Sequence, residues 1–186
     1  MTSRLCRCMV VGLLLQAMGT LAAADDDMPE PTAPVKISIA IPMHHGHRSL
    51  NDGDHLHVLV TNVSDKPIRV WTDRFSWGYD NLSFEMIDND GNDGNVTRVI
   101  KKPRNWTKNY PDWLELEVGG SYVLNVDWYS ERGRAQWDNT PTADGKRGPT
   151  PVKLRAVYEV RPDDESRKLG VWAGKISSPV ETYAIW

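Results

Sequence analysis

Histidines are the residues whose spacing most directly suggests metal chemistry. All five lie between positions 44 and 57 of the chain. On a β-strand, His55 and His57 project from the same face, and imidazole is a common ligand of zinc, copper and nickel. Two such histidines make only half of a site, and we favour the interpretation that they are solvated polar positions. The candidate metal ligands are His44, His45, His47, His55 and His57.

A second oxygen-rich segment, Asp88–Asn95, could be considered for calcium. It reads Asp-Asn-Asp-Gly-Asn-Asp-Gly-Asn. Its glycines stand at the fourth and seventh places, not at the sixth, and no glutamate stands at the twelfth place, so the EF-hand spacing is absent. A hairpin turn that requires positive φ explains the same residues. We therefore predict a hairpin at this position.

Aromatic and basic side chains crowd two stretches, 71–79 and 104–113. The chain has eight Trp against two Phe, and an indole ring can stack on sugars or grip a protein partner. The same rings could instead supply core mass to a small domain without disulfides. Since both stretches precede predicted strands, they can gather at one end of a sandwich. The candidate ligand-binding residues are Trp71, Trp77, Tyr79, Arg104, Trp106, Lys108, Tyr110 and Trp113.

Signatures of catalysis are missing from the sequence. It contains no G-x-S-x-G nucleophile motif, no phosphate-binding glycine loop and no H-E-x-x-H pair. The carboxylates show no recognisable pairing. We therefore predict a protein that is not an enzyme and needs no cofactor.

The N-terminus has the three parts of a secretory signal peptide. Arg4 and Arg7 precede an apolar run, Met9–Leu15, which is followed by the small residues 22–24. We predict cleavage after Ala24 and a secreted or periplasmic location. No later segment is apolar enough to be predicted as a membrane span.

Removal of this signal peptide changes the composition of the chain. Its only cysteines, Cys6 and Cys8, would be lost, so the mature protein would contain no disulfide. Loss of Arg4 and Arg7 leaves 20 basic and 25 acidic side chains, so the formal charge moves from -3 to -5. This acidity argues against nucleic acid as a partner.

Apolar residues alternate with polar ones in most of the remaining chain, which is typical of antiparallel strands with one buried face. Such runs occur at 35–41, 56–60, 82–87, 114–118, 122–128, 152–160 and 182–186. We predict an all-β fold, a single immunoglobulin-like antiparallel β-sandwich of seven to eight strands spanning residues 35–186. Residues 25–34 are predicted as a disordered acidic leader, and 129–151 as a long polar loop.

Three blocks carry a resemblance to known proteins. The run Leu56–Ile68, the block Leu116–Gly120 and the strand Lys153–Tyr158 follow the order of the immunoglobulin-like domain in the Bacillus-type intracellular proteinase inhibitor family, with Val118 where that family usually has proline. This resemblance implies the fold and a binding role, and no inhibitory residue can be matched.

The chain also resembles uncharacterised secreted proteins of planctomycete-type bacteria. The similar blocks are Phe75–Tyr79, Arg104–Lys108 and Gly170–Lys175. This second resemblance covers most of the mature chain and implies no activity.

Two functions follow as expectations. The first is an exported, non-catalytic binding or structural module of the cell envelope, with an unknown protein or carbohydrate as its partner. The alternative is a metal-binding protein centred on the histidines between His44 and His57.

Overall fold

The computed structural model describes residues 33–41, 43–44, 46–50, 56–87, 95–128, 136–143, 145 and 147–185. The expected signal peptide and most of the expected leader 25–34 lie outside these residues. The described residues belong to one unit of the chain, Ala33–Trp186.

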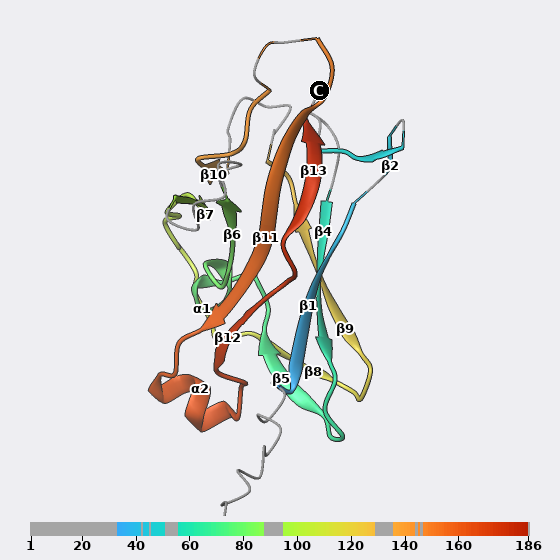
Figure 1. Cartoon of the computed structure of the whole chain (residues 1–186). Helices are drawn as coiled ribbons and strands as arrows, with labels where there is room; N and C mark the ends of the chain where they lie inside the picture. Colours follow the sequence, from blue (N-terminus) through green and yellow to red (C-terminus); the bar gives the residue numbers. More distant parts are fainter. Residues whose placement is uncertain are drawn as a thin grey trace, which may run out of the picture. The chain divides into compact units, whose positions relative to one another are not determined.

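Strands dominate this unit, as the alternating sequence predicts (Figure 1). The described helices are α1 (Ser76–Tyr79) and α2 (Asp164–Leu169). The described strands are β1 (Val35–Ala40), β2 (Met43–His44), β3 (His47–Arg48), β4 (Leu56–Asn62), β5 (Ile68–Trp71), β6 (Leu82–Ile87), β7 (Val96–Lys101), β8 (Trp113–Leu116), β9 (Ser121–Val126), β10 (Trp137–Asp138), β11 (Thr150–Val160), β12 (Gly174–Ser177) and β13 (Glu181–Ile185).

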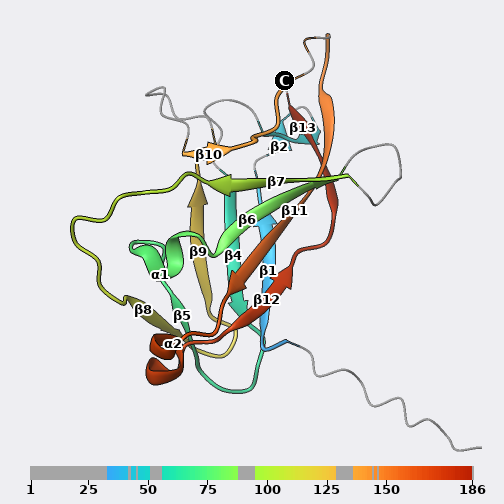
Figure 2. The same cartoon turned by 90° about the vertical axis from the view of Figure 1, so that its left-hand side faces the viewer.

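The strands form antiparallel sheets, which confirms the all-β prediction. One sheet has the order β1-β4-β9, and a larger one has the order β10-β7-β6-β11-β12, with β13 also paired to β11. β2 pairs with β3 and β5 pairs with β8 in two-stranded ribbons. In Figure 2 the long strand β11 crosses in front of β1 and β4.

A single hydrophobic core lies between the two larger sheets. Val58 of β4, Phe84 of β6 and Ala156 of β11 are fully buried members of one cluster. Trp128 and Trp137 pack on Phe84, with ring centroids 5.0 and 5.5 Å from it. Tryptophan side chains therefore fill part of the core, which is one of the two roles that the sequence predicted for them.

The described residues contain more strands than the predicted seven or eight. The β4–β9 ladder ends at the pair Thr61–Ser121, and the β5–β8 ladder begins at Ile68–Leu116. The strands β5, β7 and β12 lie outside the alternating runs of the sequence. Three further strands, β2, β3 and β10, have two residues each, too few to show a period.

The region 129–151 is not one polar loop. Within it, Trp137 and Asp138 form β10 and pair with Lys101 and Ile100 of β7, and β11 already begins at Thr150. The side chain of Trp137 is buried in the core. Trp137 therefore anchors this segment to the core, although the polar composition of the segment gives no sign of that contact.

The two helices are absent from the sequence prediction. α2 begins with a capping box, in which the Asp163 side chain accepts from Ser166 N and Ser166 Oγ accepts from Asp163 N. It ends at Gly170, whose φ of 66° favours glycine. Helices of four and six residues are too short for an apolar stripe to be recognised.

Candidate functional site

The predicted ligand-binding residues divide by burial. Trp71 is 2% exposed and Tyr79 9% exposed, so both belong to the interior and the prediction of a binding surface is wrong for them. Trp71 is buried because it ends β5 against the core. Trp77 and Trp106 are half-buried, whereas Arg104, Lys108, Tyr110 and Trp113 are exposed.

Aromatic rings from the two predicted stretches meet beside α1. The Phe75 ring lies 6.3 Å from Trp106 and 5.7 Å from Tyr110, in an edge-on arrangement with the latter. Trp106 also stands edge-on to Tyr79 at 5.4 Å. The structure thus joins Tyr79, Trp106 and Tyr110 through Phe75, which was not among the predicted binding residues. Such edge-on pairs favour a fixed ring geometry.

The segment that carries Trp106 and Tyr110, residues 102–112, is named here the Trp106 loop. Asn109 fastens it to α1, because its Oδ1 accepts from Ser76 N at 3.1 Å and its Nδ2 donates to Ser76 Oγ at 2.7 Å. Asp112 fastens the far end by accepting from the Thr72 hydroxyl and from Arg74 Nε at 2.9 Å. These contacts hold a segment without regular secondary structure in one conformation.

The basic side chains around this loop have different roles. The Arg104 guanidinium lies 4.7 Å from the Trp106 ring centroid, which is a cation–π contact at the surface. Lys108 is exposed. The Lys101 side chain is only 7% exposed, stands 3.6 Å from Asp73 Oδ2 and covers the Tyr79 ring at 4.6 Å. Lys101 is therefore a structural cation and not a surface donor.

Burial shapes the electrostatics beneath α1. It lowers the pKa of Lys101, which Asp73 opposes. It also raises the pKa of Tyr122 to about 12, and the Tyr122 hydroxyl donates to Asp73 Oδ1 at 2.7 Å. Asp73 therefore takes contacts from two elements, β7 and β9, and supports the turn that leads into α1.

Trp113 lies apart from this aromatic group. It pairs with Trp71 across β8 and β5, and the Arg69 guanidinium covers its ring at 4.3 Å from the centroid. Arg69 also bonds Glu115 Oε2 at 3.1 Å. The residues predicted to form one binding surface therefore lie on two surfaces, because strand pairing turns Trp113 toward Arg69.

The structure describes the histidines in part. His57 Nδ1 is 2.8 Å from Asn125 Oδ1 on the neighbouring strand β9. His47 is exposed on β3, and the side chains of His44, His45 and His55 lie outside what the structure describes. In the described part of the chain no three His, Cys, Asp or Glu side chains form a metal-binding group. The five-histidine site stays a prediction.

The hairpin prediction for Asp88–Asn95 is supported by its flanks. β6 and β7 pair antiparallel, with Ile87 opposite Val96. Residues 88–94 themselves lie outside the described residues, so the geometry of their oxygen atoms is not addressed.

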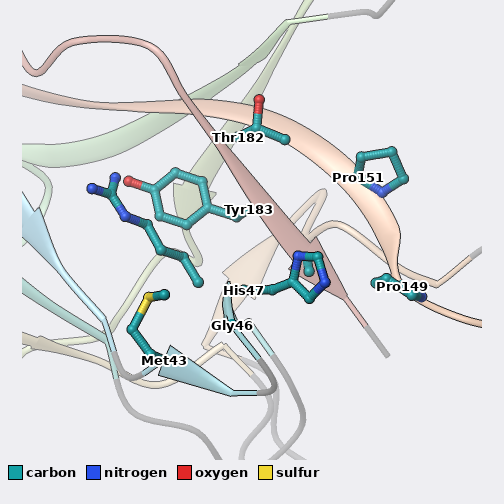
Figure 3. A pocket seen from close by; sticks show the side chains of 9 residues that line it. Met43, Gly46, His47, Pro149, Pro151, Thr182 and Tyr183 are labelled. Atoms are coloured by element: carbon teal, nitrogen blue, oxygen red, sulfur yellow. The ribbon is translucent and has the colours of Figure 1, made fainter.

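A largely apolar hollow of about 500 Å³ lies between the β2–β3 ribbon and β13 (Figure 3). Met43, Pro149 and Tyr183 line it from three distant parts of the sequence, so no local pattern predicted it. At its edge Arg48 pairs with Glu181, which also accepts from the Tyr183 hydroxyl at 2.9 Å. Of the described residues that line this hollow, His47, Arg48 and Thr182 carry polar side chains, and they do not identify a reaction or a ligand class.

Comparisons with known proteins assign this chain to no family. No protein-family model matches the chain, and no curated protein matches it in sequence. The helices in the described residues are too short or too polar to cross a bilayer.

Proposed function

We propose that this protein is an exported, non-catalytic binding module of the cell envelope. Its fold is proposed to be an immunoglobulin-like β-sandwich, which the shared core of two antiparallel sheets supports. The resemblance to secreted planctomycete-type proteins and to the inhibitor-family domain agrees with this proposal. The N-terminal signal pattern supports export.

One observation carries the proposed binding role: the fastened aromatic surface of the Trp106 loop. Tyr110 is 57% exposed although it is held against Phe75. Large exposed rings on a loop fixed by Asn109 and Asp112 lose little conformational entropy on binding. Arg104 and Lys108 add donors beside these rings. Exposed aromatic and arginine side chains are typical of binding hot spots.

The partner is proposed to be a protein or a carbohydrate of the envelope. Trp106 and Tyr110 offer both flat apolar faces and polar edges, which suit either class. Nucleic acid is disfavoured because the chain is acidic, at a formal charge of -3, and the Trp106 loop has too few basic groups to follow a phosphate backbone.

Co-sedimentation with purified bacterial envelopes tests the proposal. The mature chain, beginning at Asp25, should pellet with an envelope fraction in a saturable manner. Replacing Trp106 and Tyr110 together by Ala should weaken this binding by at least about tenfold, which corresponds to 1.4 kcal/mol. Both rings contact Phe75, so the melting temperature of the variant must be measured alongside.

The matched control is Trp113→Ala, which removes an equally large ring outside the Trp106 loop. This variant should bind like the parent protein. Equal loss with Trp113→Ala, or unchanged binding by the double variant, would contradict the proposed surface.

A further inference from the structure

A polar hollow of about 510 Å³ is lined by Ser76 and Trp77 of α1 and by Asp80 and Asn81, which follow it. Its floor includes Ser83 of β6, Arg98 of β7 and Glu159 of β11. Each neighbours a core residue along its strand, so the floor is the face of the larger sheet turned away from the core. We name this site the Trp77 hollow.

One wall of the Trp77 hollow is a fixed indole ring. Trp77 is half-buried, and its ring centroid lies 6.2 Å from that of the buried Trp71, at a tilt of 39°. The core therefore holds the ring in place at the edge of a polar space. A flat, preorganised indole surface suits stacking against the C–H face of a sugar ring.

Asn81 lines the hollow beside this wall. Its Nδ2 and the nearby Tyr158 hydroxyl are both buried, and Asn81 is the hydrogen-bonding neighbour that acts on the pKa of Tyr158. Since protein atoms cover both groups, the ligand contacts of the hollow must come from other side chains of its lining.

Charged side chains of both signs line the hollow. Arg161 Nε lies 3.5 Å from Glu159 Oε1, and Arg98 Nη2 donates to Ser83 Oγ at 3.3 Å. The Asp163 carboxylate accepts from Ser166 N at 2.6 Å. The lining holds two guanidinium groups, Arg98 and Arg161, and three carboxylates, Asp80, Glu159 and Asp163, so its formal charge is -1 and an anion is disfavoured. It offers donors and acceptors to a neutral polar ligand.

We propose that the Trp77 hollow binds a neutral saccharide of one or two sugar rings. Trp77 stacks on the ring, and Arg98 with Asp80 bonds its hydroxyls. The volume lies within the range of small-ligand pockets. This inference rests on the proposed function, because it names a ligand class for the same binding module, at a neighbouring site.

Calorimetric titration of the mature chain tests the inference. The probes are methyl β-glucoside, N-acetylglucosamine, cellobiose and diacetylchitobiose, with glucuronate and inorganic phosphate as charged comparators. At least one neutral probe should bind with a Kd tighter than about 10 mM, and the charged comparators should bind at least about tenfold more weakly.

Three variants locate the binding. Trp77→Ala should weaken saccharide binding at least about tenfold, which is the effect of losing a stacking ring. Trp77 also packs against the core, so the exposed Arg98→Ala serves as a second variant that leaves the core intact and should weaken binding about fivefold. Trp113→Ala, which lies outside both proposed sites, is the control and should change binding less than about twofold.

Three results would overturn the inference: no neutral probe binds by about 10 mM, a charged comparator binds as well, or both Trp77→Ala and Arg98→Ala bind like the parent protein. Envelope binding measured on the same samples separates the two proposals. Envelope binding that is lost only through Trp106 and Tyr110, without saccharide binding, would leave the proposed function standing and remove the Trp77 hollow as a site.

Discussion

Asn62 joins two turns through a fully buried amide. Its Nδ2 donates to the carbonyls of Lys66 at 2.8 Å and Leu116 at 2.9 Å, and its Oδ1 accepts from Ser64 N at 2.9 Å. The turn after β4 is thereby fixed to the end of β8. Asn62 lies inside the run Leu56–Ile68, on which the resemblance to the inhibitor family rests. Its amide gives part of that run a structural role, which is to fix the turn after β4.

Replacing Asn62 by Ala should lower the free energy of unfolding by about 2–4 kcal/mol, because buried carbonyls lose their donor. Urea unfolding followed by Trp fluorescence measures this loss. Ser64→Ala is the matched control and should cost less than about 1 kcal/mol, since it leaves the Asn62 donors in place. Equal losses for the two variants would contradict the role of the Asn62 amide.

Tyr122 gives a prediction about alkaline pH. Its pKa is raised from 10.0 to about 12 in the folded protein, first of all by burial. Between these values the unfolded chain releases a proton that the folded chain keeps, so stability falls as pH rises. Tyr122→Phe removes this loss, together with a hydrogen bond worth about 1 kcal/mol at neutral pH. The stability gap between parent and variant should therefore narrow above pH 10.

Urea midpoints at several pH values from neutral to alkaline test this. Tyr158 and Tyr183 also have raised pKa values, so the variant keeps part of the alkaline decline. Only the difference between the two proteins reports on Tyr122. A gap that stays constant or widens above pH 10 would show that the Tyr122 proton is not held by the fold.

At the scale of elements, α2 depends on its first residue. Asp163 accepts from Ser166 N, and this hydrogen bond is the largest cause of its lowered pKa. A carboxylate whose folded pKa is lowered stabilises above its unfolded pKa, and that contribution is lost as pH falls through the folded pKa. The helix is also tied to β5, because Arg69 Nη1 donates to the Leu169 carbonyl at 2.9 Å.

Asp163→Ala should lower the free energy of unfolding by about 1 kcal/mol, the usual effect of losing an N-cap. Thermal melting at neutral pH measures this effect, and Asp163→Asn, which keeps an accepting oxygen, should recover most of it. If the melting temperature of the Ala variant still equals that of the parent, the cap does not stabilise the helix.

Sequence patterns predicted some elements better than others. Alternation located β6 at 82–87, yet Ser83 and Glu85, assigned to its wet face, are buried. That face is covered because Glu85 pairs with Arg155 of β11 at 2.6 Å and the Arg98 side chain donates to Ser83 Oγ at 3.3 Å. A period of two reports which residues share a face and does not report what covers the face.

The sequence predicted which aromatic stretches contribute to the candidate site, but not how their side chains are arranged. The aromatic stretches around Trp77 and Trp106 do meet beside α1. The outward turn of Trp113 and the burial of Lys101 depend on how β5, β7 and β8 pair, which no local pattern records. Asn81 and the Trp77 hollow follow from the packing of α1 over the larger sheet and gave no signal in sequence.

At the scale of the whole molecule, removal of the proposed signal peptide would leave packing to replace disulfides. Trp71, Trp128 and Trp137 fill the core in a chain whose only cysteines are Cys6 and Cys8. Intact-mass analysis of the exported protein should give a chain that begins at Asp25. A mass that retains both cysteines would contradict cleavage, and a melting temperature lowered by a reducing agent would contradict a disulfide-free core.

The central claim is that the Trp106 loop contacts an envelope partner. Hydroxyl-radical footprinting with mass spectrometry measures it directly, because exposed rings are oxidised more slowly when they are covered. In the presence of a binding envelope fraction, oxidation of Tyr110 and Trp106 should fall at least about threefold while that of Trp113 stays unchanged. Unchanged oxidation of Tyr110 and Trp106 under conditions where the protein is bound would contradict the claim.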